Sequence, residues 1–457
     1  MPAVTIRSYN PADPADLVAE APRPGAEAVL ATVDRARTAQ AGWLAAGAGG
    51  RSAALTRIAE AIETHAEELA ELVVREVGKP IAEARGEVAR TVAIWRYNAQ
   101  APFEASGEVH ETAAGPGLLL TRRRPYGVAG LITPWNFPLA IPSWKAAPAL
   151  AVGNAVVLKP SSEAIGVARR LGELIAGAGL PADVLTVLPG GAAEGTALVG
   201  AADVVSFTGS TGVGRQVVRT ATERGIPVQA ELGGLNAAVV LPDADFDQAA
   251  AHLAGAIAGY AGQKCTATSR VVAVGAAYEP LREALVKALA AVDGTACGPV
   301  INEATRDGIT AAVDSAREAG AEVLTGGTVP ERDGWWLAPT LVTGVPAEHP
   351  LHREEFFGPI AVLYAAAGLD EAVAIANDTP YTLSASVHTR NLDAALTAAD
   401  RLDAGMIRVN APSSGVDFHL PFGGAKGAGH GAREQGRAAL DFYTQSRTIS
   451  LLPAGDA

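Results

Sequence analysis

Hydrophobic residues recur at helical spacing over residues 51–77 of the chain. No glycine or proline interrupts this run, and its regularly spaced apolar positions are Leu55, Ile58, Ile62, Leu69 and Leu72. The period of three to four residues predicts one amphipathic helix over the whole run. Gly78 and Pro80 come next and are expected to end it, because both residues disfavour a helix interior.

Shorter apolar runs then alternate with longer Ala-rich segments. Gly, Pro or Asp residues bound the runs, which have the length of strands: GVAGLIT (127–133), AVVLKP (155–160), DVLTVLPG (183–190) and DVVSFTGS (203–210). Strands that alternate with helices at this spacing predict parallel βαβ units in a doubly wound sheet.

A second series of the same kind begins after residue 233. Its expected strands are NAAVVLPDA (236–244), SRVVAVGA (269–276), AEVLTGG (321–327), PIAVLYAAA (359–367) and MIRVNAP (406–412). Two further segments, 117–124 and 443–452, look like strands that lie outside both cores. The predicted fold class is therefore α/β, with a doubly wound parallel sheet, a second α/β domain and a small β extension.

Composition narrows the class of protein. The 457 residues are 49% hydrophobic and carry a formal net charge of −13, which suits two or three globular domains and opposes nonspecific binding to nucleic acid or anionic membranes. The apolar stretches are broken well before the ~20 residues of a membrane span, and the N-terminus lacks the apolar core of a secretory signal. We expect a cytoplasmic protein without nucleic-acid or membrane partners.

The chain has only two cysteines, Cys265 and Cys297, which cannot form a disulfide framework, and no CxxC pair suggests a metal site. Cys265 lies in AGQKCTATSR (261–270), between a Gly-Gln-Lys turn and small polar residues. Taken alone, this context fits either a small buried hydrophobe or a nucleophile.

Two more segments carry residues suited to acyl chemistry. In TPWNFPL (133–139) two prolines bracket Asn136, whose amide is either an oxyanion donor or part of a packed Asx turn. In QAELGGLNA (229–237) Glu231 ends a predicted strand beside two glycines, and it is either a general base for water or a solvated carboxylate at a hinge.

Two polar segments at strand ends suit an anionic ligand. FTGSTGVGRQV (207–217) opens a helix and offers the Ser210 hydroxyl and backbone N–H groups, although it is not the GxGxxG fingerprint and could be a plain βα turn. Lys159 ends AVVLKP, where it either pairs with ribose hydroxyls or a phosphate or is simply solvated.

Taken together and in this order, the motifs resemble the aldehyde dehydrogenase superfamily over nearly the whole chain. They are PWNFP, KPS, FTGS, ELGG, GQKC, EEFFGP (354–359) and PFGG (421–424). The resemblance implies that the Cys265 thiolate attacks an aldehyde and that Asn136 holds the resulting oxyanion. It also implies hydride transfer to NAD or NADP and hydrolysis of the thioester by water that Glu231 activates.

The resemblance also implies a set of cofactor-binding residues: Lys159, Ser162, Ser210, Gly209, Trp135, Glu355, Phe357 and Gly233. Glu434 resembles an acid on the water or proton path. Family members strict for NAD often carry a glutamate three residues after the lysine, a position that Ser162 occupies here, with Glu163 one residue later. A missing carboxylate removes the repulsion of a 2′-phosphate, so either NADP or NAD remains possible.

Within the superfamily, NAPSSGVDFHLPFGG (410–424) looks most like the 2-oxoglutarate semialdehyde (2,5-dioxopentanoate) dehydrogenases. A remote substrate carboxylate would require cationic donors, for which Lys145, Lys264 and Arg270 are candidates, although we expect Lys264 to be solvated. Benzaldehyde-type and biosynthetic aldehyde dehydrogenases remain alternatives. So do a CoA-acylating enzyme, against which Glu231 argues, and a catalytically silent binding protein.

The family architecture implies domain boundaries. We expect a cofactor domain from residues 1–102 and 127–233, a catalytic domain from 234–428, and oligomerisation strands from 103–126 and 437–457. Because an exposed strand edge invites pairing with another subunit, we expect a homodimer or homotetramer.

Overall fold

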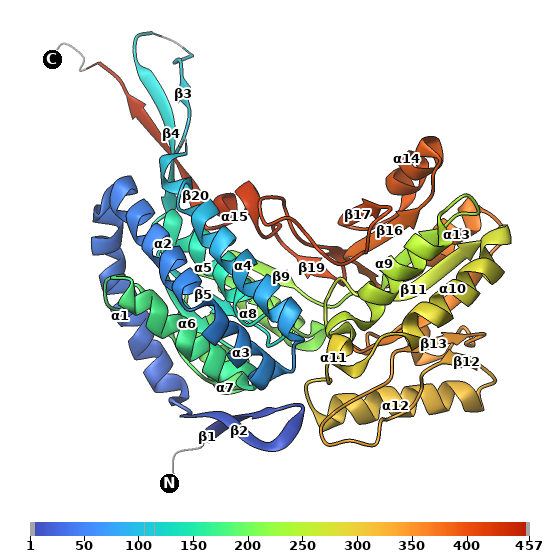
Figure 1. Ribbon diagram of the computed structural model, residues 1–457. Helices are drawn as coiled ribbons and strands as arrows, with labels where there is room; N and C mark the ends of the chain where they lie inside the picture. Colours follow the sequence, from blue (N-terminus) through green and yellow to red (C-terminus); the bar gives the residue numbers. More distant parts are fainter. Residues whose placement is uncertain (1–4, 105, 114, 454–457) are drawn as a thin grey trace.

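The computed structural model describes residues 5–104, 106–113 and 115–453 and contains two lobes, each built on a mostly parallel sheet (Figure 1). The predicted α/β fold class is confirmed. Of the predicted domains, residues 1–4 of the first and residues 105, 114 and 454–457 of the extension lie outside the described residues. The division of the chain at residue 233 stays a prediction.

The first sheet has six strands, of which five are parallel and the short β19 is antiparallel. In spatial order they are β19 (Gly429–His430), β9 (Val228–Glu231), β8 (Val204–Thr208), β5 (Val128–Ile132), β6 (Ala155–Lys159) and β7 (Leu185–Val187). Successive side chains of a strand point to opposite faces. Val156 and Leu158 therefore join one apolar core, and Ala155 and Val157 join another.

Helices cover both faces of this sheet. On one face lie α5 (Ala140–Ala151) and α6 (Ile165–Gly177), with α2 (Gly47–Thr64), α3 (Ala66–Val77) and α4 (Ile81–Asn98) packed outside them. On the other face lie α1 (Gly25–Ala45), α7 (Ala192–Ala201) and α8 (Thr211–Glu223). All residues of α5 are buried, which is why its sequence is almost continuously apolar.

The prediction of a single helix over residues 51–77 is wrong in one respect. The segment forms two helices, α2 and α3, that meet at His65, whose backbone leaves the helical region (φ −106°, ψ 25°). The His65 ring contacts the Ala61 carbonyl at 2.8 Å. Ile62 and Leu69 are buried on both sides of this break, so the apolar period does not reveal it. The predicted stop at Gly78 is confirmed, with a left-handed φ of 68°.

The second sheet has seven strands, all parallel except the edge strand β12. In order they are β12 (Glu322–Thr325), β13 (Thr340–Thr343), β14 (Ile360–Ala366), β11 (Thr268–Val274), β10 (Asn236–Val240), β16 (Ser384–His388) and β17 (Met406–Val409). The sequence prediction missed β13 and β16. Threonines at both ends of β13 and small or polar side chains along β16 weaken their apolar signal.

Helices flank the second sheet as well. One core contains α9 (Phe246–Ala258), α10 (Tyr278–Ala290), α11 (Gly294–Cys297) and α12 (Glu303–Glu318), and the other contains α13 (Leu369–Asn377) and α14 (Leu392–Arg401). Between the lobes, β15 (Tyr381–Thr382) pairs with β18 (Ala425–Lys426), and α15 (Gly436–Phe442) returns the chain to α5. Single 3₁₀ turns are η1 (Ala101–Phe103), η2 (Ser162–Ala164), η3 (Gly259–Gly262), η4 (Gly275–Ala277) and η5 (Pro350–His352).

Two antiparallel units lie outside the sheets. The predicted outlying strands are confirmed as β4 (Leu118–Pro125) and β20 (Thr444–Leu451), which pair along their length and form, with β3 (Val109–His110), an arm that projects from the body (Figure 1). The hairpin β1 (Thr5–Asn10) and β2 (Asp13–Pro22) was not predicted, because its Pro and Asp residues obscure the alternation. It is attached through Ser8, which donates to Glu76.

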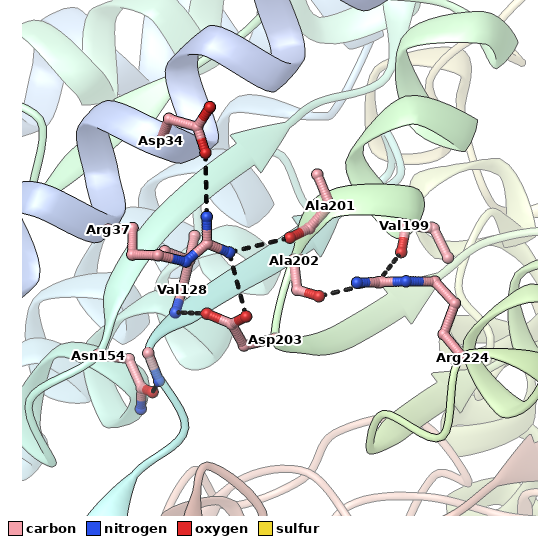
Figure 2. A network of polar contacts seen from close by, with 10 residues as sticks. Asp34, Arg37, Val128, Asn154, Val199, Ala201, Ala202, Asp203 and Arg224 are labelled. Atoms are coloured by element: carbon pink, nitrogen blue, oxygen red, sulfur yellow. Dashed lines mark hydrogen bonds and ion pairs between the residues drawn. The ribbon is translucent and has the colours of Figure 1, made fainter.

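A polar network fixes the amino-terminal edge of the first sheet (Figure 2). Asp203, just before β8, accepts from the Val128 backbone N–H at 2.8 Å and from Arg37 at 3.1 Å. Beside it, the Gly127 N–H donates to Asn154 at 3.0 Å. A Cβ on Gly127, whose φ is +139°, would lie 2.5 Å from an Asp203 carboxylate oxygen, so only glycine fits there. These bonds fix the starts of β5 and β8 and thereby the positions of their carboxyl ends.

Within the described residues, no helix combines the length and the apolar character needed to cross a membrane.

Candidate active site

The turn that carries Cys265 has an unusual backbone. Tyr260 and Ala261 adopt left-handed conformations (φ 52° and 51°), and Gly262 follows with φ +66°. A Cβ on Gly262 would lie 2.1 Å from the Gly358 carbonyl, so the turn packs backbone to backbone against the EEFFGP loop. Non-glycine residues hold such conformations only where the surroundings impose them, and they cluster at functional sites.

The side chain of Cys265 is partly exposed, and three carboxylates lie near it. Desolvation by the surrounding protein atoms is the main cause that raises the pKa of Cys265, and Glu355, Glu231 and Glu434 raise it further. Asn236 on β10 fixes the turn by donating to the Cys265 carbonyl at 2.8 Å. Cys297 is instead buried in the apolar core of the second lobe. The structure thus separates the two cysteines into one at a polar site and one in the core.

Asn136 contacts the nucleophile turn directly. Its Nδ2 donates to the Gln263 carbonyl at 3.0 Å, which leaves a second N–H on the same nitrogen. The Asn136 side chain is buried, and its Oδ1 has no hydrogen-bond partner among the described residues. An amide held in this way two residues from the Cys265 position can donate to an oxygen that develops charge near the sulfur.

Glu231 ends β9 in a buried position and accepts a hydrogen bond of 3.3 Å from the Gly424 N–H of the PFGG turn. The predicted alternative of a solvated hinge carboxylate is therefore wrong. Burial, with a smaller contribution from Glu434, raises the pKa of Glu231 well above that of a free glutamate, while Lys145 acts in the opposite direction. A carboxylate with a raised pKa is a stronger base toward water.

Glu434 lies behind Glu231 in a fully satisfied environment. It accepts from Trp144 Nε1 at 2.6 Å and pairs with the buried Lys145 ammonium, which also donates to Ser206 at 2.7 Å. Neither Trp144 nor Ser206 was predicted as a site residue, although a serine inside the apolar run VVSFT is a signal of a buried polar contact. This ion pair connects α5, β8 and the segment before α15 beneath the site.

A crevice of about 440 Å³ lies outside the carboxyl ends of β5, β6 and β8 and accounts for most of the predicted cofactor residues. Those that line it are Trp135, Lys159, Ser162, Gly209 and Ser210. Parallel sheets bind ligands at this edge. The crevice also contains the buried Thr133, whose hydroxyl has no partner among the described residues.

Lys159 is buried at the base of this crevice, so the alternative of a solvated lysine is wrong. Its ammonium donates to the carbonyls of Pro160 and Gly190 at 2.8 and 3.1 Å. Burial lowers the pKa of Lys159 to about 8. Glu163 does not turn into the crevice but meets Asn302 at 3.4 Å, which leaves Ser162 at the exposed rim.

Glu355 and Gly233 come together at the other end of the site. A Cβ on Gly233 would lie 2.3 Å from a Glu355 oxygen, and the neighbouring Gly234 N–H donates to Glu355 at 2.9 Å. Burial raises the pKa of Glu355 to about 7. The Phe357 ring meets Trp135 edge-on at 5.7 Å, which links the EEFFGP loop to PWNFP.

The three cations proposed for a substrate carboxylate are all engaged elsewhere. Lys145 pairs with Glu434, and Arg270 is buried, stacks on Tyr364 and donates to the carbonyls of Ala376 and Asp378. Lys264 forms an ion pair with Glu83 at 2.8 Å with only 13% of its side chain exposed, so its predicted solvation is wrong.

Comparisons with known proteins lead to the family that the sequence motifs resemble. A model of the aldehyde dehydrogenase family matches residues 2–449. The alpha-ketoglutaric semialdehyde dehydrogenase of Bacillus subtilis is 37% identical, covering 98% of this chain and 95% of that protein. The alpha-ketoglutarate semialdehyde dehydrogenase of Haloferax volcanii is 38% identical, covering 97% and 95%. The crystal structure of an NAD-dependent aldehyde dehydrogenase from Sinorhizobium meliloti superposes with a TM-score of 0.94 at 36% identity, covering 99% of this chain and 92% of that one.

Proposed function

The chain belongs to the aldehyde dehydrogenase family and is an aldehyde dehydrogenase that uses NAD or NADP, and on this premise we propose that it oxidises the semialdehyde of a keto acid, such as 2-oxoglutarate semialdehyde, to the carboxylic acid. One observation supports the mechanism: Asn136, Glu231 and Glu355 all lie near the turn that carries Cys265.

In the first half-reaction, the Cys265 thiolate forms a bond to the aldehyde carbon, and the carbonyl electron pair moves to oxygen. The free N–H of Asn136 and the backbone N–H of Cys265 stabilise this oxyanion. Since burial and three carboxylates raise the pKa of Cys265, the free enzyme holds the thiol protonated and unreactive. A bound nicotinamide dinucleotide would supply a positive charge near the thiol and the acceptor for the hydride that the thiohemiacetal carbon must lose as its oxyanion re-forms a carbonyl, which gives the thioester.

In the second half-reaction, Glu231 takes a proton from water. The hydroxide adds to the thioester carbon, the Cys265 thiolate leaves, and a carboxylic acid is released. Glu231 suits this step because burial raises its pKa, and the Lys145–Glu434 pair behind it can accept or return a proton through the buried polar side chains. A hydrolytic base at this place supports water, rather than coenzyme A, as the acyl acceptor.

The residues of the crevice fit a dinucleotide. The unpartnered Thr133 hydroxyl and the start of α8 at Ser210 can donate to phosphate oxygens, Lys159 can donate to ribose hydroxyls, and the rim at Ser162 carries no carboxylate. At the far end, Glu355 can accept from the hydroxyls of the second ribose, with Phe357 and Trp135 beside it. We expect NADP to be accepted because nothing charged at residue 162 repels a 2′-phosphate.

Reduced-cofactor absorbance with 2-oxoglutarate semialdehyde, benzaldehyde and short aliphatic aldehydes, each with NAD and with NADP, tests this proposal. We expect the highest kcat/KM with the keto-acid semialdehyde. Activity confined to apolar aldehydes would refute the proposed substrate and favour a benzaldehyde-type or biosynthetic role. Turnover that requires coenzyme A would refute hydrolysis by Glu231.

We further propose that the chain acts as a homodimer or homotetramer in the cytoplasm. The β20 edge of the projecting arm supports this, because it is solvent-exposed and ends in the half-exposed Leu451. The thiol nucleophile requires a reducing compartment. A stable monomer in sedimentation velocity would contradict the oligomer.

A further inference from the structure

An arginine on α4 has no polar partner among the residues that the structure describes. Arg90 is partly buried, and its Nε is shielded from solvent without a hydrogen-bond acceptor in the described part of the chain. None of the hydrogen bonds and ion pairs found among the described residues involves its guanidinium, and burial lowers the pKa of Arg90. A charge in such a place is costly unless something binds it.

Arg90 lies close enough to Cys265 for that residue to influence its pKa. Burial lowers the pKa of Arg90, and Asp417, Glu87 and Cys265, in that order of effect, act in the opposite direction. Glu87, one helical turn earlier on α4, accepts from the Leu139 and Ala140 N–H groups at 2.9 and 3.0 Å, directly after PWNFP. Arg90 therefore lies one turn from a glutamate that is bonded to the residues directly after the predicted oxyanion donor.

The VDFH segment (416–419) borders the same region from the other side. Val416 packs in the small apolar cluster that also contains Cys265. Two residues later, the Phe418 ring meets Tyr97 of α4 edge-on at 5.7 Å. The segment thus extends from the nucleophile to α4, with the exposed Asp417 between these two contacts. Arg90 lies on the same helix as Tyr97, close enough to Asp417 for the carboxylate to raise its pKa.

The two carboxylates near Arg90 do not neutralise it. Glu87 already accepts the two backbone bonds and pairs with the buried Lys79 ammonium. Asp417 is exposed and forms no ion pair with Arg90 within the described residues. Lys145 and Lys264 are held in ion pairs, and Arg270 donates to two backbone carbonyls through Nη1, although its Nε also lacks an acceptor among the described residues. Arg90 is left as a cation near the nucleophile with donors to spare.

We propose that Arg90 binds the carboxylate at the far end of the substrate and so selects aldehydes that carry a second, anionic end. This inference rests on the proposed function and names its specificity-determining residue. A guanidinium matches a carboxylate with two parallel N–H···O bonds, and the partly buried position strengthens them. Binding fixes the other end of the chain, the aldehyde carbon, at the Cys265 sulfur.

The test compares Arg90→Met with the parent on two aldehydes of equal chain length, 2-oxoglutarate semialdehyde and pentanal. We expect kcat/KM for the keto-acid semialdehyde to fall roughly 100-fold, mainly through KM, because truncating one partner of a buried charge pair has an effect of this order. Pentanal, which has no carboxylate, should keep its kcat/KM or gain. Calorimetry with 2-oxoglutarate should show a parallel loss of affinity without turnover.

Arg96→Met is the matched control, since Arg96 is on the same helix but exposed and paired with Glu63. It should leave both substrates unchanged. If Arg90→Met keeps the parent's preference for the keto-acid semialdehyde, this inference is wrong while the proposed substrate stands. If the parent itself has no such preference, both fail. If Arg90→Met does not fold, Arg90→Lys is judged by the same ratio, and it should retain part of the preference.

Discussion

At the amino-terminal edge of the first sheet, Asp203 accepts bonds from Val128 and Arg37 at 2.8 and 3.1 Å (Figure 2). At the carboxyl edge, by contrast, the Glu231 carboxylate accepts one bond within the described part of the chain, from the Gly424 N–H at 3.3 Å. Asp203 is partly exposed and fully bonded, but Glu231 is buried and under-bonded. The first arrangement stabilises the fold, and the second shifts a pKa at the expense of stability.

The same contrast extends to neighbouring groups at the two edges. Arg37 and Arg224 at the amino edge each donate to backbone carbonyls of the segment around α7. At the carboxyl edge, the Thr133 hydroxyl and Asn136 Oδ1 have no partner within the described residues. Buried polar atoms without a hydrogen-bond partner are tolerated where a ligand will bind them. Function is therefore expected at the carboxyl edge, where such atoms occur. Substitutions at the two edges should therefore separate activity from stability.

The largest effect is expected from Cys265→Ala. Without the nucleophile no thioester forms, and turnover should fall by roughly 10⁴-fold or more, while thermal stability changes little. Reduced-cofactor absorbance and thermal unfolding would measure the two effects. Cys297→Ala is the matched control, because Cys297 is buried in an apolar core. It should cost some stability and keep kcat within about twofold. Substantial turnover by Cys265→Ala would contradict the mechanism.

Glu231→Gln should stop the reaction after the first half. Steady-state turnover should fall by roughly 10²–10³-fold, with a burst of about one reduced cofactor per active site, since only hydrolysis needs the base. Glu223→Gln, at the exposed end of α8, serves as control and should show normal turnover. A loss of the burst together with the steady-state rate would place Glu231 in the first half-reaction instead.

The same variant has a pH-dependent effect on stability. Because burial raises the pKa of Glu231, the folded protein holds a proton that the unfolded chain releases, and stability falls as pH rises above the unfolded pKa. Glu231→Gln removes this term. Its apparent melting temperature should therefore exceed that of the parent at pH 8, and the difference should shrink toward pH 4.5.

Asp203→Ala is expected to lower stability and leave activity nearly unchanged, whereas the substitutions at the carboxyl edge lower activity. Loss of the bonds to Val128 and Arg37 should reduce the free energy of unfolding by about 1–3 kcal/mol, since hydrogen bonds to charged groups have this strength. The carboxyl ends of the strands remain connected by their ladders, so kcat should stay within about twofold. Urea unfolding and steady-state kinetics on the same preparation would check this. A large loss of kcat without loss of stability would remove the distinction between the edges.

The sequence predicted the lobes and the arm because each depends on local patterns. Strands β5, β6 and β8 are predominantly apolar runs. The turns that carry the reactive residues contain Gly and Pro close to those residues. It could not place His65 as a break, because the apolar period continues across it. Nor could it predict the partners of Lys264 and Arg270, which depend on Glu83 and on the Ala376 and Asp378 carbonyls far along the chain. Arg90 was missed for the same reason: in sequence it looks like a surface arginine of a helix.

The smallest effect expected is on cofactor choice at the rim of the carboxyl edge. Ser162 lines the crevice and is exposed, so Ser162→Glu should place a carboxylate where a 2′-phosphate would lie. Like-charge repulsion should then weaken binding of NADP by roughly tenfold and leave NAD almost unchanged.

Calorimetry with 2′,5′-ADP and with AMP would isolate the contribution of that phosphate from turnover. Glu163→Gln is the matched control, since the Glu163 carboxylate faces Asn302 at 3.4 Å rather than the crevice. It should leave the ratio of the two affinities unchanged. If Glu163→Gln shifts the ratio and Ser162→Glu does not, Glu163 must turn into the crevice when the cofactor binds. In that case the rim would rearrange on binding, unlike the fixed network around Asp203.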